Sequence, residues 1–456
     1  MYHNALERRT RNASKGNTYI RYRDTKRFSE EQFKLTLEQT PWDTIFVFDE
    51  FDDMLESWEN LFNEALDLHC PWRNKRVALV TQTPWMSNAI LKQLRLRDTL
   101  LKKAKRSKDP FDWAKYKKAR NKAVGMSRTA KRKYCVSKLE NNQDNTRELW
   151  KTFKSISGMN KQPKRVSSLK AGEHLLDDKE QMASKFNSHF TSIADQLRSL
   201  LPQMNLDISK LIHFVDSRKD AGIDFSIPPS TKRKVIDCLK NIRSNKASGI
   251  DKLSARMLKF AAPIIAPSIA KLINYSFSKS VFPQRWKTAK VFPLFKSGDS
   301  ENVNNYRPIS VLPVLSKVID KHVHDTLYSY LCDNNLIYPK QSGFRKRHST
   351  ETALIGIIDE LLFNLDKDRV SGMILIDYCK AFDMVDHSIL QQKLQVYGLD
   401  SKSLAWFGSY LDGRRQLVSM DDKESPTAWV SHGVPQGSIL GPLLFITCIN
   451  DLPLHC

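Results

Sequence analysis

The sequence has no long apolar run and no paired cysteine motif. Its 456 residues contain no apolar stretch of the roughly 20 residues that a membrane-spanning helix needs. Residues 1–17 lack the apolar core of a secretory signal. The seven cysteines are scattered, odd in number and without a Cys-x-x-Cys pair, which argues against a zinc site or a disulfide framework. We therefore expect an intracellular protein, neither secreted nor held in a membrane. The short basic signal Lys131–Cys135 (KRKYC) adds the nucleus to the cytoplasm as its expected location.

The sequence is also short of negative charge. It has 73 Lys and Arg against 50 Asp and Glu, so its formal net charge is +23. Such an excess makes the chain repel itself, and it usually indicates a polyanionic partner. Nucleic acid is the leading candidate, and an anionic membrane surface is the second.

Much of the excess lies in one segment, residues 86–135, which hold 17 Lys and Arg but only 3 Asp. Its composition favours helix, and Trp113 and Tyr116 lie among the cations. Such a pattern suits phosphate contact and base stacking, and the alternative is a solvated helical connector. The residues expected to bind nucleic acid are Lys102, Lys103, Lys105, Arg106, Lys115, Lys117, Lys118 and Arg120.

Changes in composition divide the chain into four segments. Residues 1–80 have helical spacing, and their Asp52-Asp53 pair is a candidate metal site or, as we expect, the acidic start of a helix. Residues 81–165 form a basic helical connector, and residues 166–229 a helical segment with a linker. Residues 230–456 carry most of the motifs.

One motif brings carboxylates to the end of an apolar run. Met373–Ile376 are four apolar residues between polar neighbours, which predicts a central strand buried on both faces. Asp377 ends this run, and burying it is costly unless a cation or strong donors meet it. The alternative is that Asp377 or Asp383 caps the next helix.

Two other segments have the residue types of a nucleotide site. Gly433–Pro442 frame Gln436 with glycines and prolines, which allows close approach of a ligand or another backbone. Lys296 and Arg307 flank a glycine-containing turn, where they could hold a triphosphate. Lys296 would act as a point charge, and Arg307 would donate two parallel hydrogen bonds. Taken singly, Gly433–Pro442 are better explained as a turn before a buried helix, and Lys296 and Arg307 as ordinary surface cations.

Taken in order, the motifs resemble the reverse transcriptases of non-LTR (LINE-type) retrotransposons, relatives of group II intron reverse transcriptases. The resemblance covers about residues 230–456. Its blocks are Asn245–Asp251 (NKASGID), Phe295–Asp299 (FKSGD) with Asn305–Leu312 (NYRPISVL), Gln341–Thr350 (QSGFRKRHST), Leu375–His387 (LIDYCKAFDMVDH) and Gly433–Phe445 (GVPQGSILGPLLF). The resemblance implies an α+β fold with the fingers and an incomplete palm of a right-hand polymerase, preceded by a mostly helical basic region.

The resemblance also implies roles for individual residues. Asp377 looks like the catalytic carboxylate that binds metal, with the carbonyl of Tyr378 beside it, and two Mg²⁺ ions would activate a primer 3′-hydroxyl and stabilise the pyrophosphate leaving group. Phe382 looks like the gate that excludes a ribose 2′-hydroxyl. Asp383 is expected to structure the following turn.

The remaining assignments concern the substrates. Lys296 and Arg307 look like contacts to the triphosphate, and Gln436 and Gly437 look like the loop that lines the incoming nucleotide and the template. The implied function is RNA-directed DNA polymerisation, with an RNA template, a DNA primer or target and deoxynucleoside triphosphates as partners. A non-catalytic nucleic-acid-binding protein derived from a retroelement is the alternative.

The family's second metal-binding motif, an aromatic-x-Asp-Asp hairpin, is expected after the Gly433–Phe445 block. Only nineteen residues follow Gly437, and none of them fits. Asp421-Asp422 has a similar pattern but precedes the block, and its flanks predict an ordinary hairpin turn. We therefore expect a catalytically incomplete chain that also lacks the family's endonuclease.

Overall fold

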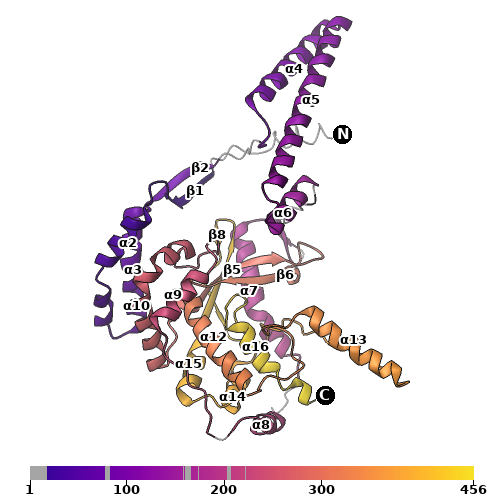
Figure 1. The fold of residues 1–456 in the computed structure, drawn as a ribbon. Helices are drawn as coiled ribbons and strands as arrows, with labels where there is room; N and C mark the ends of the chain where they lie inside the picture. The colour runs from indigo at the N-terminus through magenta and orange to yellow at the C-terminus, as the bar shows by residue number, and fades with distance from the viewer. Residues whose placement is uncertain are drawn as a thin grey trace. The chain divides into compact units, whose positions relative to one another are not determined.

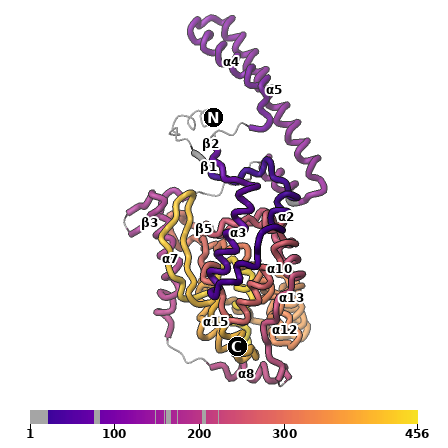
Figure 2. The backbone as a smooth tube through the Cα atoms, turned by 90° about the vertical axis from the view of Figure 1, so that its left-hand side faces the viewer, coloured from indigo at the N-terminus to yellow at the C-terminus, as the bar shows by residue number. Residues whose placement is uncertain are grey.

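The structure is a computed structural model, and it describes residues 18–77, 83–157, 159, 166–172, 174–202, 207–220 and 222–455. The chain forms two compact units (Figures 1 and 2). Unit 1 comprises residues 1–23 and 72–165, and unit 2 comprises residues 24–71 and 166–456. Residues 24–71 therefore pack with the motif-rich part of the chain, and the expected segment 1–80 is divided between the units.

Unit 1 is a helical hairpin with a small sheet. Strand β1 (Thr18–Arg23) pairs antiparallel with β2 (Trp72–Val77). Helices α4 (Asn88–Ser107) and α5 (Pro110–Glu140) lie side by side, and α6 (Thr146–Ile156) follows (Figure 1). Small side chains at the contact allow the two long helices to approach closely, and the buried ones are Ala104, Ala119 and Ala123.

Unit 2 is built on a mixed sheet with the order β6-β5-β7-β8, and β9 also pairs with β7. Strands β5 and β7 are parallel, and the other pairs are antiparallel. The strand bounds are β5 Thr288–Phe295, β6 Tyr306–Val311, β7 Arg414–Met420, β8 Lys423–Glu424 and β9 Ala428–Val430. A separate hairpin joins β3 (Leu169–Ala171) and β4 (His174–Leu176).

One helix, α7 (Lys179–Arg198), covers the sheet. Its Phe186 and Phe190 are buried in a cluster with Val291, Tyr306 and Val418 from the strands. Phe186 meets the ring of Tyr306 edge to face at a centroid distance of 4.8 Å. Phe186 and Phe190 are four residues apart, so they lie on one face of the helix, and this face packs on the sheet.

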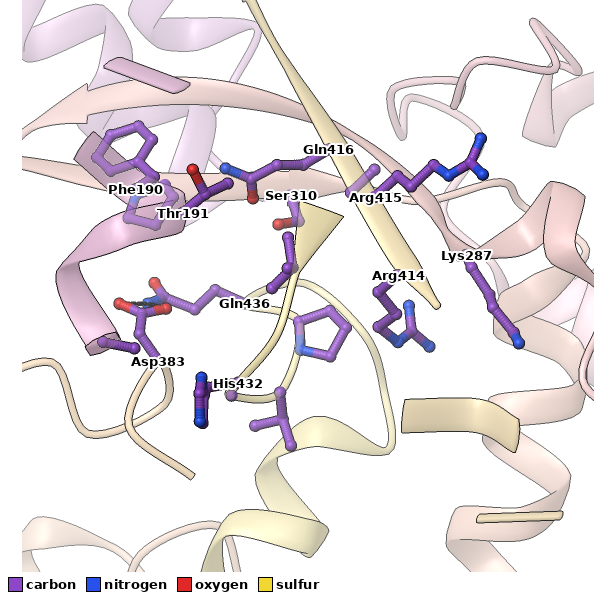
Figure 3. A pocket seen from close by; sticks show the side chains of 17 residues that line it. Phe190, Thr191, Lys287, Ser310, Asp383, Arg414, Arg415, Gln416, His432 and Gln436 are labelled. Carbon is purple, nitrogen blue, oxygen red and sulfur yellow. Dashed lines mark hydrogen bonds between the residues drawn. The ribbon is translucent and has the colours of Figure 1, made fainter. Parts of the chain in front are cut away.

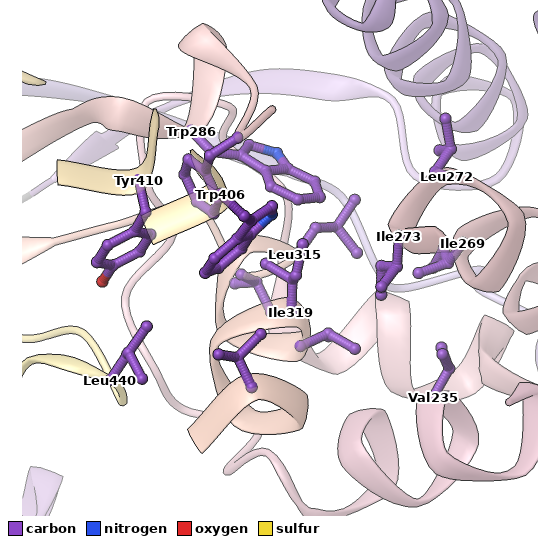
Figure 4. Packing of buried hydrophobic residues seen from close by; sticks show 14 of the residues in the cluster. Val235, Ile269, Leu272, Ile273, Trp286, Leu315, Ile319, Trp406, Tyr410 and Leu440 are labelled. Atoms are coloured by element: carbon purple, nitrogen blue, oxygen red, sulfur yellow. The ribbon is translucent and has the colours of Figure 1, made fainter. Parts of the chain in front are cut away.

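The larger core of unit 2 is helical. Trp286, Trp406 and Tyr410 pack beside Leu315 and Ile319 (Figure 4). The helices around this core are α2 (Glu30–Gln39), α3 (Phe51–His69), α9 (Lys232–Asn241), α10 (Ala255–Lys279), α11 (Gln284–Lys287), α12 (Ser316–Asp333), α14 (His387–Val396), α15 (Ser401–Leu411) and α16 (Gly441–Ile449). Helix α8 (Ser209–Asp216) adds Leu211 and Phe214. The chain is thus a mixed helix-and-sheet protein, as an α+β fold requires.

Helix α10 qualifies the prediction about apolar runs. By length and composition it could cross a membrane, but most of its apolar window is buried inside the protein. Its Ser268 accepts a hydrogen bond from the indole of Trp58 at 2.9 Å, and its Ser276 accepts one from Trp406 at 3.0 Å. These contacts explain its apolar character as that of a core helix.

Ser349 caps α13 (Thr350–Asp366) in a reciprocal arrangement with Thr352. The predictions for the two Asp-Asp pairs are confirmed. Asp52 and Asp53 lie in the first turn of α3, where Asp52 accepts hydrogen bonds from the first backbone amides of α11. Asp421 and Asp422 form the turn between β7 and β8.

The prediction of a buried strand at Met373–Ile376 is wrong. This segment belongs to no strand in the described structure, and its side chains are 55–88% exposed. An extended segment needs a neighbour on at least one edge to pair its backbone groups, and no described residue supplies one. The preceding helix, α13, buries none of its residues and extends away from the rest of unit 2 (Figure 1).

Candidate active site

Three motifs that are far apart in the sequence meet around the loop Gly433–Leu440. The amides of Gly433 and Val434 donate to the carbonyls of Val385 and Phe382 at 2.8 and 2.9 Å. The amide of Ser310, on β6, donates to the carbonyl of Gln436 at 3.1 Å. The loop is therefore held by backbone hydrogen bonds on both sides.

Glycine is required at two positions of this loop. Gly433 has a φ of +84°, and a Cβ there would lie 2.7 Å from the carbonyl oxygen of Phe382. Gly437 has a φ of +152°, and a Cβ there would overlap the carbonyl oxygen of Ser310. Close approach of two backbones is thus the physical reason for these glycines.

A cavity of about 50 Å³ opens beside the loop (Figure 3). Gln436 crosses it, and its Nε2 donates to both carboxylate oxygens of Asp383 at 3.0 and 3.1 Å. Burial raises the pKa of Asp383, and the hydrogen bond from Gln436 partly opposes that effect. Arg414, His432 and Ser310 also line the cavity.

A buried polar cluster lies beneath the same loop. The Oδ2 of Asp320, on α12, accepts from the amide of Ile439 at 3.3 Å, and burial raises the pKa of Asp320 to about 7. Arg414 donates from Nε to the carbonyl of Tyr410 at 2.8 Å. Within the described structure, Asp320 Oδ1, Tyr410 Oη and Arg414 Nη2 have no hydrogen-bond partner. Buried polar groups without hydrogen bonds cost free energy. We therefore expect the stability of the loop to depend on whether Asp320 is protonated.

The turn before α14 anchors the other side of the loop. His387 Nε2 donates to the carbonyl of Gly433 at 2.7 Å, and burial lowers the pKa of His387. Asp386 caps α14 by accepting from the amides of Ser388 and Ile389. The structure thus assigns the helix cap to Asp386 and not to Asp377 or Asp383.

Phe382 lies close to the loop but faces other aromatic rings. Its ring stacks on Phe445 at a centroid distance of 4.9 Å and meets Phe344 edge to face at 5.6 Å. It is partly buried against the helical core. The expected contact with a sugar stays a prediction.

The two expected triphosphate ligands lie on the β5–β6 hairpin. Arg307 is opposite Leu294 in the strand register, and the amide of Lys296 donates to the carbonyl of Asn305 at 2.8 Å. Both cationic side chains are exposed. They lie on the same hairpin as Ser310, but neither lines the cavity that holds Gln436.

Asp377 and Tyr378 are not brought into the cavity. Both are exposed and lie in the irregular segment after α13. Among the described residues, no three His, Cys, Asp or Glu side chains lie together as a metal site. The described residues therefore do not fit the two-metal centre that the resemblance implies, since no such cluster of ligands surrounds Asp377 among them.

The eight expected nucleic-acid contacts gather on the helical hairpin of unit 1. They occupy the end of α4 and the first half of α5, on either side of the turn, and all eight are exposed. Lys103 pairs with Asp112 at 3.1 Å, and Lys115 lies 4.2 Å from the ring centroid of Phe111. Most of the positive charge thus remains available to a partner.

Sequence reasoning missed Asp320, Arg414 and His387 as supports of the loop. Asp320 follows Ile319 on a helix whose pattern predicts only an apolar face, so no local signal marks it. His387 is inside a motif, and its position next to a helix cap was the one available signal.

Comparison with known proteins identifies the domain. The family "Reverse transcriptase (RNA-dependent DNA polymerase)" matches residues 296–456. This range contains Ser310, Asp383 and Gln436, the residues that converge at the cavity. Residues 296–456 therefore resemble a reverse transcriptase domain. A second family, the female sterile protein K10 C-terminal domain, matches residues 88–146, which form the α4–α5 hairpin.

Relatives extend the similarity beyond this reverse transcriptase domain. The chain is 25% identical over 433 residues to the RNA-directed DNA polymerase from mobile element jockey of Drosophila melanogaster, covering 93% of this chain and 46% of that protein. It is 28% identical over 368 residues to the probable RNA-directed DNA polymerase from transposon BS of the same organism, covering 78% and 39%. The X-element protein is 31% identical over 232 residues, covering 51% and 25%. The chain spans less than half the length of these relatives.

Proposed function

We propose that the chain is part of an RNA-directed DNA polymerase of a non-LTR retrotransposon. In this proposal it binds an RNA template, a DNA primer and a deoxynucleoside triphosphate, and it contributes to phosphoryl transfer at the primer 3′-hydroxyl. The β5–β6 hairpin and α9–α12 act as fingers, and the sheet with the Gly433–Leu440 loop acts as part of the palm.

One observation carries this proposal. The loop Gly433–Leu440, the turn at Phe382–Asp386 and strand β6 are joined by backbone hydrogen bonds around one cavity. All three segments lie within residues 296–456, the range that the reverse transcriptase family matches. Sequence motifs that are remote in the chain but adjacent in space indicate a shared site.

The roles of single residues are part of the proposal. Lys296 and Arg307 hold the triphosphate, and Gln436 and Gly437 line the nucleotide and the template. Phe382 excludes a 2′-hydroxyl once the sugar lies beside its ring. Asp377 and the Tyr378 carbonyl supply part of a Mg²⁺ site, and we propose that the described residues alone do not complete it.

Primer extension tests the function. The chain is mixed with a DNA primer on an RNA template, Mg²⁺ and deoxynucleotides, and template–primer binding is measured in parallel. We expect binding of the template–primer, stabilised by the next correct deoxynucleotide, and little or no extension. Arg307→Ala and Lys296→Ala should each weaken nucleotide retention about tenfold, the equivalent of about 1.4 kcal/mol.

Matched variants decide between outcomes. Lys402→Ala removes an exposed cation from α15 and should leave nucleotide retention unchanged. Extension that Asp377→Asn abolishes and Asp422→Asn does not would show a complete active site and contradict the proposed incompleteness. Absence of any template–primer binding would contradict the polymerase proposal itself.

A second function is favoured by the basic hairpin and by the absence of a three-ligand metal cluster among the described residues. In that case the chain is a non-catalytic nucleic-acid-binding protein. RNA binding that ignores deoxynucleotides, and that is unaffected by Arg307→Ala, would favour this second function.

A further inference from the structure

Helix α7 is fixed on the sheet by its middle turns. Phe186 and Phe190 are buried against the strands. Between them, the Nδ2 of Asn187 donates to the carbonyl of Pro426 at 2.8 Å, and its Oδ1 accepts from Gln416 at 3.1 Å. Asn187 is itself buried, and a fully paired polar group inside a core allows few alternative positions. The helix is therefore held in one place along and around its own axis.

The last turns of α7 reach the two segments that flank the cavity. The Oδ1 of Asp195 lies 3.1 Å from the Nδ1 of His432, which directly precedes the Gly433–Leu440 loop. Arg198 forms an ion pair of 2.5 Å with Asp386, the cap of α14. Asp195 and Arg198 are three residues apart, so they lie on one face of the helix. One face of α7 thus holds two segments that are remote from each other in the sequence.

These contacts close a ring that begins and ends on α7. Between the two ion-pair partners, His387 donates to the carbonyl of Gly433 and directly follows the cap residue in the sequence. The members of the ring, in order, are Asp195, His432, Gly433, His387, Asp386 and Arg198. Because both ends are attached to one fixed helix, the loop and the turn cannot shift relative to each other without breaking a contact.

The two links between α7 and the ring differ in strength. Burial would raise the pKa of Asp386, but hydrogen bonds from Ser388 and Ile389 and the pairing with Arg198 hold it well below its usual range. The Asp386 side chain is only 16% exposed, so solvent screens this ion pair in part. The Asp195 side chain is 59% exposed, and such pairs contribute little to folding stability. Loss of both links should therefore change the position of the loop more than the stability of the chain.

We infer that Asp195 and Arg198 are positioning residues, which hold the Gly433–Leu440 loop against the Phe382–Asp386 turn in the arrangement that retains the incoming nucleotide. The inference rests on the proposed function and extends it to a helix outside residues 296–456, the range that the reverse transcriptase family matches. Neither side chain contacts the nucleotide. Both act through the ring, and the loop that they hold carries the glutamine proposed to line the nucleotide.

Two double variants that leave the net charge unchanged test the inference. Asp195→Asn/Arg198→Gln removes both links between α7 and the ring. The matched control, Glu180→Gln/Lys423→Gln, removes an ion pair of 3.4 Å between the first turn of α7 and strand β8. Retention of the next correct deoxynucleotide on a bound template–primer should fall about tenfold in the first variant and stay unchanged in the control. Affinity for the template–primer without nucleotide should be the same in all three proteins.

Hydrogen exchange measures the positioning directly. The amides of Gly433 and Val434 donate to the carbonyls of Val385 and Phe382, and they should exchange faster in Asp195→Asn/Arg198→Gln but not in the control. The single variant Arg198→Lys keeps the positive charge. It should recover most of the retention and protection that Arg198→Gln loses, whereas a merely structural defect would lower the melting temperature of both.

The outcomes separate the inference from the proposed function. The inference is overturned, and the proposed function stands, if the α7 variant and its control agree in nucleotide retention or in loop exchange. A fall in template–primer affinity equal to the fall in nucleotide retention also overturns it, because the defect would then not be confined to the nucleotide. Failure of the unsubstituted chain to retain the deoxynucleotide overturns both.

Discussion

At the scale of single residues, the Gln436–Asp383 contact adds a side-chain link to the backbone hydrogen bonds that hold the Gly433–Leu440 loop. A carboxylate that accepts two hydrogen bonds from one amide is a strong acceptor, and losing the donor leaves it partly buried without compensation. The contact also keeps Gln436 from pointing freely into the cavity. Binding of a nucleotide that needs Gln436 would have to compete with Asp383 for it.

A double-mutant cycle measures this contact. Asp383→Ala, Gln436→Ala and the double variant should give a coupling energy of about 1–3 kcal/mol in urea unfolding, because one partner is charged. Asp422→Ala, in an exposed turn, should change stability by less than about 0.5 kcal/mol. A coupling near zero would mean that the two side chains do not act as a pair.

Asp320 makes stability depend on pH. Its pKa is raised to about 7 in the folded chain, so the folded state holds a proton that the unfolded state releases from about pH 4 upward. The associated stability is present below that pH and is lost as the pH rises toward 7. Asp320→Asn should therefore flatten the fall in melting temperature between about pH 4 and pH 7.

The same pH series has a built-in comparison. Asp251 is also buried with its pKa raised to about 7, and its Oδ2 has no hydrogen-bond partner in the described structure. The single variant should remove only part of the pH dependence, and adding Asp251→Asn should remove more. If neither substitution alters the slope, both carboxyl groups stay charged or are better solvated than the geometry indicates.

At the scale of elements, local signals predicted helices well and one strand badly. The acidic first turn of α3 and the Asp421-Asp422 turn depend on neighbours within a few residues, so the sequence alone predicts them. A strand at Met373–Ile376 depends on a partner strand, and an apolar run alone does not supply one. For the candidate site, the order of the motifs predicted which segments contribute to it. The contributions of Asp320 and Arg414 could not be predicted, because they depend on tertiary packing.

Helix α13 and the segment after it expose an unusual amount of apolar surface. Leu354, Ile355, Ile358, Leu362 and Phe363 are each more than half exposed. Apolar patches of this kind promote association when nothing covers them. The effect of this apolar surface on association can therefore be measured with substitutions in α13.

Substitution of this face should improve solution behaviour. Ile358→Lys/Leu362→Lys is expected to lower binding of an apolar fluorescent dye and slow aggregation, with no loss of melting temperature. The matched control is Ile319→Lys on α12, where the side chain is fully buried, and it should destabilise unit 2 severely. A fall in melting temperature for the α13 variant would show instead that this face packs within the chain.

At the scale of the whole molecule, the proposed binding of nucleic acid involves two units that are built differently. Unit 2 contains the cavity beside the Gly433–Leu440 loop, and unit 1 carries a hairpin of long basic helices. The hairpin has little apolar surface to bury, so its sequence is free to carry charge. Residues 88–146 are similar to a second family, and they lie outside the range that the reverse transcriptase family matches.

Neutralising the hairpin should weaken RNA binding in a salt-dependent way. Each cation that contacts a phosphate of a single strand contributes about 0.7 to the slope of log affinity against log salt concentration. Lys102→Ala/Lys105→Ala/Lys117→Ala/Lys118→Ala should therefore reduce that slope by about 2–3, measured by anisotropy with a single-stranded RNA between about 50 and 200 mM salt. The control removes four exposed lysines from unit 2, namely Lys232, Lys240, Lys279 and Lys402, for the same change in net charge. If both variants lower the slope equally, net charge alone explains the binding. If neither does, the hairpin is a solvated connector, because cations that contact phosphate cannot be removed without releasing fewer counterions.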